Sequence, residues 1–403
     1  MVLILSVCVV TVSSAGLVYA QTDKDNLING SVQNEFVINN GILTEYKGNA
    51  QDVIIPDTVR EIGEKAFLGK GLKKVIIPET VTYIGKDAFY NCKELKEVCI
   101  DGNKLKEIGE KAFSNCKSLY LIELPEGVEK IGKSAFSSSS LVFLKTPSTL
   151  KEVGNSAFFN TKLFGVSLNK GLKTVGSSAF ETCYSLQGLF IPSSVTSIGN
   201  SVAGDNGSSF KYLVIDNDNA NIGKSLTDNM NISYFGGLSS NFKSHYDAIY
   251  NKKPTKCKLK FNDKSTFVSY SEFSFIEKSK DLKPDEVYAP ILSKKPADVS
   301  FDTVNYFSID PNIAKVDKGG KITAMKIGKT KILAIGGNKL ACIDIRVKVD
   351  NLSDLFKVEN GKLVAYSGHD EEITIPDNVS TISSSVFKNN QKIRKIVCGK
   401  NGF

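Results

Sequence analysis

The sequence predicts a β-rich solenoid, built as a ladder of parallel strands with short helical turns, followed by an all-β sandwich and the start of a second repeat array. Three observations support this fold class. A segment recurs every 22–24 residues, a later stretch loses this period, and the first pattern returns near the end of the 403-residue chain. Such a period is typical of solenoids, because each rung has an apolar edge that only a neighbouring rung covers.

The repeat is clearest in one glycine and one phenylalanine. The segment VREIGEKAF, at 59–67, recurs with its glycine at Gly63, Gly85, Gly109, Gly132, Gly154, Gly176 and Gly199. Its phenylalanine recurs at Phe67, Phe89, Phe113, Phe136, Phe158 and Phe180. Between these turns lies a strand pattern, L-x-x-V-x-I. We expect strands about 4.8 Å apart, glycine permitting a tight or left-handed turn, and the rings forming a continuous internal spine.

Both ends of the first array carry capping signals. Residues 36–44 predict a β-hairpin around Asn39-Asn40-Gly41, which covers the first rung. Residues 240–251 predict a helix with one apolar face, which covers the last rung. Terminal rungs need such covers because their outer edges otherwise expose the core.

The first twenty residues predict an export signal. The apolar stretch at 2–12 is too short to span a bilayer, and Val18 and Ala20 are small residues before a polar segment. We therefore expect cleavage after Ala20, a secreted or cell-surface location, and no membrane span in the mature chain.

The remaining patterns define two further parts. Residues 307–337 alternate apolar and polar residues between turns, which favours a small β-sandwich. Residues 358–387 then repeat the pattern of 38–67, and we expect this second array to be truncated because it stops after barely two rungs. The expected parts are a signal peptide at 1–20, a linker at 21–35, the solenoid at 36–262, the sandwich at 263–350 and the second array at 351–403.

Charge and histidine content exclude several functions. The net charge is +8, but charges of both signs are interleaved and only three arginines are present, which argues against a nucleic-acid reader. The whole chain has only two histidines, His245 and His369, which excludes most His-based triads and polyhistidine metal sites. The loop at 216–221 lacks the glycine and glutamate of a calcium loop. We expect no enzyme activity, no cofactor and no metal.

The cysteines favour structural roles. Seven remain after Ala20, and an odd count argues against a complete disulfide framework. Cys92, Cys116 and Cys183 each follow a repeat phenylalanine by three residues, where a small buried side chain fits. We expect buried free thiols. A disulfide between Cys92 and Cys116, on adjacent rungs, is the alternative.

The repeat resembles a known family. The pattern C-x-x-L-x-x-V-x-I-P-x-x-V-x-x-I-G-x-x-A-F, followed closely from Cys92 to Phe113, resembles the BspA-like leucine-rich repeat family of bacterial surface proteins. The resemblance covers roughly residues 36–261 and resumes at 356. Residues 310–334 resemble the bacterial immunoglobulin-like group 2 domain. These resemblances imply a secreted or cell-surface protein, and some family members are described as adhesins for host matrix proteins.

These observations lead to a non-catalytic binding protein as the main functional hypothesis. Its partner would be a host or bacterial surface protein, or a glycan or wall polymer. One alternative is a wall-associated spacer of a larger exported protein, with the lysines of 252–260 touching wall polymer or forming a solvated face. The other is an exported enzyme whose catalytic domain lies beyond residue 403.

The expected binding surface lies on the concave sheet. Strand side chains alternate, so the variable positions of L-x-x-V-x-I should point to solvent. From the third rung on, these positions carry the apolar residues Tyr120, Leu121, Val142, Phe143, Phe164 and Phe190. An exposed apolar patch with aromatic residues is typical of a contact site. The alternatives are that the cap region or the Ig-like neighbour covers this patch, or that the rungs are shifted by one residue.

Overall fold

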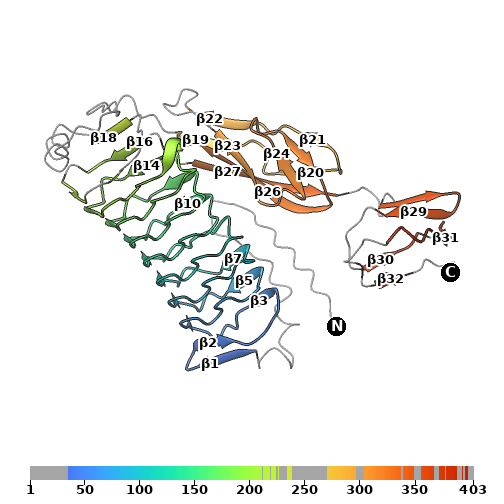
Figure 1. Ribbon diagram of the computed structural model, residues 1–403, viewed down its shortest axis with the longest axis horizontal. Helices are drawn as coiled ribbons and strands as arrows, with labels where there is room; N and C mark the ends of the chain where they lie inside the picture. Colours follow the sequence, from blue (N-terminus) through green and yellow to red (C-terminus); the bar gives the residue numbers. More distant parts are fainter. Residues whose placement is uncertain are drawn as a thin grey trace.

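The computed structural model describes residues 35–223, 234–237, 270–295, 304–348 and 355–397, with short gaps inside these ranges. The expected signal peptide, most of the linker and the expected cap helix at 240–251 lie outside the described residues. Three parts follow one another along the chain: the solenoid, a β unit (residues 270–348) and the second array (residues 355–397) (Figure 1).

Ten strands form one continuous ladder along the solenoid, which we call the glycine ladder because a repeat glycine follows most of them. The antiparallel hairpin β1–β2 opens the ladder, and each later strand pairs in parallel with its neighbour. Its strands are β1 (Phe36–Asn39), β2 (Ile42–Tyr46), β4 (Glu61–Ile62), β6 (Tyr83–Ile84), β8 (Glu107–Ile108), β9 (Lys130–Ile131), β11 (Glu152–Val153), β13 (Thr174–Val175), β15 (Ser197–Ile198) and β17 (Asn221–Ile222).

The L-x-x-V-x-I strands form a second side of the solenoid, which we call the leucine ladder. It consists of three parallel sheets, β3-β5-β7, β10-β12 and β14-β16-β18. Its strands are β3 (Asp52–Ile54), β5 (Lys74–Ile77), β7 (Glu97–Ile100), β10 (Phe143–Lys145), β12 (Gly165–Ser167), β14 (Gly188–Ile191), β16 (Tyr212–Ile215) and β18 (Tyr234–Gly237). The parallel-strand solenoid predicted from the period is therefore confirmed.

The expected short helical turns are wrong. Two residues after each repeat glycine, and two after each repeat phenylalanine, the backbone has a positive φ of 51–67° in the first seven rungs, as at Lys65 and Asn91. A left-handed residue cannot continue a right-handed helix. Within the described part of the solenoid, the one helical element is a single 3₁₀ turn, η1 (Gly207–Ser209).

The phenylalanine rings form the spine that the repeat predicts. Successive rings from Phe67 to Phe180 stack with centroids 4.8–5.4 Å apart and interplanar angles of 2–8°. Each of these rings is fully buried. Tyr46 and Phe36 of the hairpin extend the stack at its first end. The ring spacing is close to that of the strands, so each ring covers the one before it.

The repeat glycines are required by close packing rather than by their own backbone conformation. A Cβ added to Gly109 would lie 2.7 Å from the carbonyl oxygen of Ile84 and 2.9 Å from the carbonyl carbon of Gly85, both in the preceding rung. None of the repeat glycines from Gly63 to Gly199 has a positive φ. The left-handed positions lie two residues later, which corrects the expectation of a left-handed glycine turn.

The β unit has its own core and three sheets, of order β19-β22, β20-β27-β26-β23 and β21-β25-β24. Its strands are β19 (Glu272–Phe275), β20 (Ser279–Leu282), β21 (Val287–Tyr288), β22 (Leu292–Lys295), β23 (Val304–Ser308), β24 (Ala314–Val316), β25 (Ile322–Ala324), β26 (Gly328–Gly336) and β27 (Lys339–Val347). All three sheets contribute to one apolar core. This arrangement does not by itself define an Ig-like sandwich.

The second array opens with a copy of the first hairpin. Strands β28 (Phe356–Glu359) and β29 (Lys362–Tyr366) repeat the register and the irregularity of β1–β2. The rings of Phe356 and Tyr366 lie 4.9 Å apart, against 5.0 Å for Phe36 and Tyr46. The strands that follow are β30 (Glu372–Thr374), β31 (Thr381–Ile382) and β32 (Lys395–Val397).

We expect Phe113→Ala to lower the free energy of unfolding by about 3–5 kcal/mol, because it removes a fully buried ring between two others. Urea unfolding of the full chain measures this loss, with the exposed Tyr184→Ala as the matched control. Because rungs depend on their neighbours, hydrogen exchange should increase across residues 89–136. Unchanged exchange there would contradict the spine.

We expect Gly109→Ala to lower the free energy of unfolding by about 1–3 kcal/mol, because the added methyl group overlaps backbone that cannot move aside. Gly71→Ala is the control, since no atom lies within 4 Å of its added Cβ. Equal unfolding midpoints for the two variants would show that close packing between rungs is not the reason why glycine recurs at this position.

Candidate functional site

Four of the six residues expected on the concave sheet meet in one apolar cluster, which we call the apolar seat: Tyr120, Val142, Phe143 and Phe164. They come from three successive rungs of the leucine ladder. Val142 is 0% exposed and Phe143 is 3% exposed. The other two predicted residues, Leu121 and Phe190, are half-buried and do not belong to this cluster.

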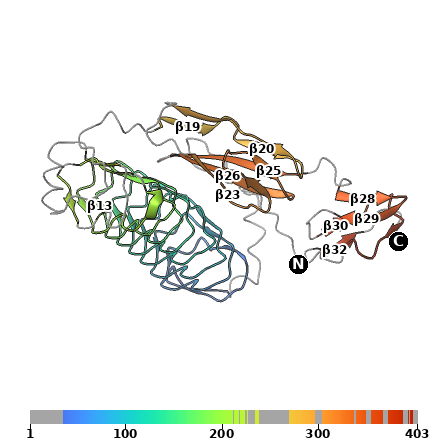
Figure 2. The ribbon, with the colours of Figure 1, turned by 45° about the horizontal axis from the view of Figure 1, so that its top comes forward.

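The β unit covers the apolar seat. Leu333 and Ile335 of β26 are fully buried against it, and Phe307, Ile309, Leu340 and Cys342 complete the contact. The ring of Phe307 lies 5.5 Å from the ring of Tyr120 and 6.4 Å from that of Phe164. Figures 1 and 2 both show the orange β unit beside the middle rungs of the solenoid.

The expectation that this patch is exposed is therefore wrong for Val142 and Phe143. The neighbouring unit covers them, which is the alternative that the sequence left open. The physical reason is that β26 is apolar on both faces. Ile332 and Ala334 point into the core of the β unit, whereas Leu333 and Ile335 point at the solenoid. A ligand-binding role for the six residues stays a prediction.

Sequence reasoning missed the covering residues, although a signal was present. Residues 332–335, Ile-Leu-Ala-Ile, form an unbroken apolar run. A strand with one solvated face shows alternation, whereas an unbroken run is typical of a strand that is buried on both faces. This run predicts that something packs on each side of β26.

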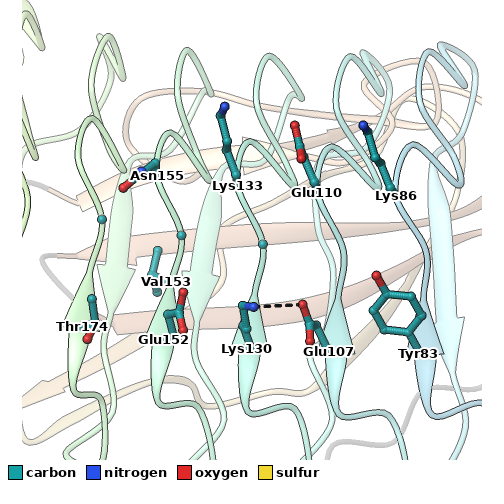
Figure 3. A pocket seen from close by; sticks show the side chains of 13 residues that line it. Tyr83, Lys86, Glu107, Glu110, Lys130, Lys133, Glu152, Val153, Asn155 and Thr174 are labelled. Carbon is teal, nitrogen blue, oxygen red and sulfur yellow. Dashed lines mark ion pairs between the residues drawn. The ribbon is translucent and has the colours of Figure 1, made fainter. Parts of the chain in front are cut away.

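A second surface, on the glycine ladder, was also missed. A shallow groove of about 450 Å³ runs across β6, β8, β9, β11 and β13. Figure 3 shows two rows of side chains along it. One row contains Tyr83, Glu107, Lys130, Glu152 and Thr174, and the other contains Lys86, Glu110, Lys133 and Asn155. Glycines Gly132, Gly154 and Gly176 lie between the rows together with the side chain of Val153, so most of the floor carries no polar side chain.

Charges of both signs line the groove. Lys130 and Glu107 form an ion pair at 3.2 Å, which raises the pKa of Lys130. Burial raises the pKa of the Tyr83 hydroxyl. In the part of the chain that the structure describes, the side chains of Lys86, Glu110, Lys133 and Glu152 form no hydrogen bond or ion pair. The sequence contains a signal for this groove, because a polar residue recurs on each side of the repeat Ile-Gly.

A second network of ion pairs lies beside the groove. Glu129 accepts from Lys106 at 3.2 Å and from Lys151 at 2.9 Å, so one carboxylate links three rungs. Hydrogen bonds from both lysines lower the pKa of Glu129. Both oxygens of Glu129 are therefore paired with a lysine, whereas Lys86, Glu110 and Lys133 in the groove form no ion pair within the described residues.

The cysteine thiols serve the fold. Cys92, Cys116 and Cys183 each donate to the carbonyl oxygen of the phenylalanine in the preceding rung, at 3.0–3.3 Å. All three are buried free thiols, as the sequence predicts, and Cys92 and Cys116 form no disulfide. Burial raises the pKa of Cys92 to about 12 and that of Cys183 to about 11. Protonated, enclosed thiols are poor nucleophiles.

Other chemical centres are limited within the described ranges. No group of three or more His, Cys, Asp or Glu side chains that could hold a metal occurs in them. Both histidines lie outside the described residues. No helix in the described part is long and apolar enough to cross a bilayer.

These features define the class: a leucine-rich-repeat β-solenoid that presents one polar groove and one covered apolar face. The chain belongs to the family described as the BspA type leucine rich repeat region, which matches in six copies over residues 38–164, 130–256 and 362–402.

Solved structures of similar proteins come from several bacteria. A leucine-rich repeat protein of T. pallidum is 35% identical, with 36% of this chain and 71% of that chain covered and a TM-score of 0.35. A leucine-rich cell surface protein of Faecalibacterium prausnitzii is 17% identical, with 90% and 92% covered and a TM-score of 0.33. The pneumococcal vaccine antigen PcpA is 17% identical, with 53% and 78% covered and a TM-score of 0.25. No curated protein matches the chain.

We expect Cys92, Cys116 and Cys183 of the folded protein to resist alkylation by iodoacetamide at pH 8.5, and to react once guanidinium unfolds the chain. The cause is burial, which keeps each thiol protonated and enclosed. Peptide mass mapping after a timed exposure measures each site separately. Rapid labelling of Cys92 in the folded chain would contradict its burial in the solenoid core.

The same thiols should make stability depend on pH. A raised pKa in the folded state means that the unfolded thiols ionise first, near pH 8.5. The thiols therefore contribute fully to the free energy of unfolding below about pH 8.5. This contribution is lost as the pH rises from there toward 11–12. Urea unfolding at pH 7.5 and pH 10 should show a smaller loss in the triple Cys→Ser variant than in the native chain. An equal loss in both proteins would contradict this linkage.

Proposed function

We propose that this protein is a non-catalytic binding protein of the bacterial cell surface or the secreted fraction, and that its polar groove holds a protein partner. The observation that carries the proposal is the row of charges that includes Lys86, Glu110 and Lys133, whose side chains form no hydrogen bond or ion pair with the described residues. The ladder fixes the backbone positions from which these side chains extend, so a partner meets charges at a regular spacing without ordering the backbone.

The family supports binding rather than catalysis. Leucine-rich-repeat solenoids expose extended surfaces on which each rung contributes side chains at the same few positions. The buried thiols donate hydrogen bonds to backbone carbonyl oxygens and therefore serve a structural role. The export signal that residues 1–20 predict supports a surface or secreted location.

The charge pattern favours a protein partner over a wall polymer. An anionic wall polymer would be matched by a row of one sign, whereas this groove alternates lysine and glutamate in both rows. Protein surfaces carry both signs and can match such a pattern, which gives specificity and speeds association. The partner in this proposal is a host or bacterial surface protein.

The β unit takes a supporting role in the proposal. We assign it to the Ig-like type that residues 310–334 resemble, acting as a spacer between the two arrays. Its single core and its contact with the solenoid support a unit that folds on its own and packs against the first array.

We expect the double variant Lys86→Glu and Lys133→Glu to weaken partner binding by roughly fivefold or more, and to reduce its dependence on salt, because two exposed groove charges change sign. The control is Lys93→Glu with Lys96→Glu, an equal change of charge at two exposed lysines outside the groove. Binding is measured on immobilised matrix proteins, on intact bacterial cells and on purified peptidoglycan.

Measuring binding on matrix proteins, on cells and on peptidoglycan distinguishes the candidate partners. Binding to protein or cells that only the groove variant loses supports the proposal. Binding to peptidoglycan alone, or equal losses in both variants, would refute a protein partner in the groove.

A further inference from the structure

The contact between the β unit and the solenoid stands apart from the cores on either side. Val142 and Phe143 of the apolar seat are not part of the solenoid core, and Leu333 and Ile335 are not part of the core of the β unit. The phenylalanine spine and the sheets of the β unit therefore keep their own packing when this contact opens. Opening exposes the seat and its cover without unfolding either part.

The two sides of this contact form a matched pair. The ring of Phe307 lies between Tyr120 and Phe164, and Leu333 and Ile335 lie over Val142 and Phe143. Every copy of the chain carries both sides. A second copy therefore offers the seat a cover with the same contacts, and no new interface has to form.

The chain length between the two sides permits such an exchange. Residues 238–271 join β18 to β19. At about 3.3–3.6 Å per residue, a connection of this length has a maximum reach on the order of 100 Å. Covalent geometry therefore does not restrict the β unit to the seat of its own chain.

We propose that the apolar seat is a self-recognition surface, which takes the β unit of its own chain or the β unit of a second copy. When two chains exchange β units, both seats are filled and the pair closes, so exchange costs little beyond the association itself. The tether favours the contact within one chain at low concentration, because it holds the cover at a high effective concentration. At high local concentration, as on a crowded surface, the exchanged pair increases. This inference is independent of the groove.

Complementation between two variants tests the proposal. Phe143→Asp damages the seat and leaves the cover intact, whereas Leu333→Asp damages the cover and leaves the seat intact. We expect each variant alone to be monomeric and more extended than the native chain. Mixed in equal amounts, they should form a heterodimer, because the intact seat of one meets the intact cover of the other. Sedimentation velocity over a concentration series, with one variant isotopically labelled for native mass spectrometry, measures this.

The double variant Phe143→Asp with Leu333→Asp is the matched control, since it carries both changes but offers no intact pair between copies. It should remain monomeric at every concentration. Folded variants that stay monomeric when mixed would overturn the proposal, as would dimers in the double variant. If either aspartate prevents folding, Phe143→Ala and Leu333→Ala replace them, with circular dichroism as the check of fold.

Discussion

The close approach of successive rungs is the constraint on which the rest of the solenoid depends. The backbone of one rung lies so near the glycine of the next that no side chain fits between them. The same spacing brings the phenylalanine rings into continuous stacking and places each cysteine thiol against a carbonyl of the preceding rung. Stability is therefore distributed along a line, and every rung depends on the two beside it.

The regular backbone also separates the two surfaces. On the glycine ladder, the residues on either side of the repeat Ile-Gly face outward, so they form two rows along the groove. On the leucine ladder, the outward positions vary from charged at β5 and β7 to apolar at β10, and the apolar part is where the β unit packs. One scaffold thus carries an exposed polar surface on one side and, on another, an apolar surface that the β unit of the same chain covers.

The period of 22–24 residues was enough to predict the parallel ladder, the ring spine and the thiol positions, because each follows from stacking identical rungs. The left-handed turn after each repeat glycine was not predictable from residue type, since Lys65, Asp87 and Ser134 fill the same position. The burial of Val142 and Phe143 was left open for a different reason. The alternation of side chains along a strand identifies which of them point away from the solenoid core. It does not identify which other part of the chain packs against them.

The position of the apolar seat along the solenoid determines where rungs can be added or removed without disturbing the contact with the β unit. The seat occupies rungs around residues 120–164, and the opening hairpin lies several rungs before it. Duplication of one whole rung between β4 and β8 would lengthen the protein by about 4.8 Å and leave the seat, the β unit and the hairpin unchanged. It would also add one side chain to each row of the groove. Gain or loss of whole rungs therefore changes the length of the groove without altering the contact between the β unit and the solenoid.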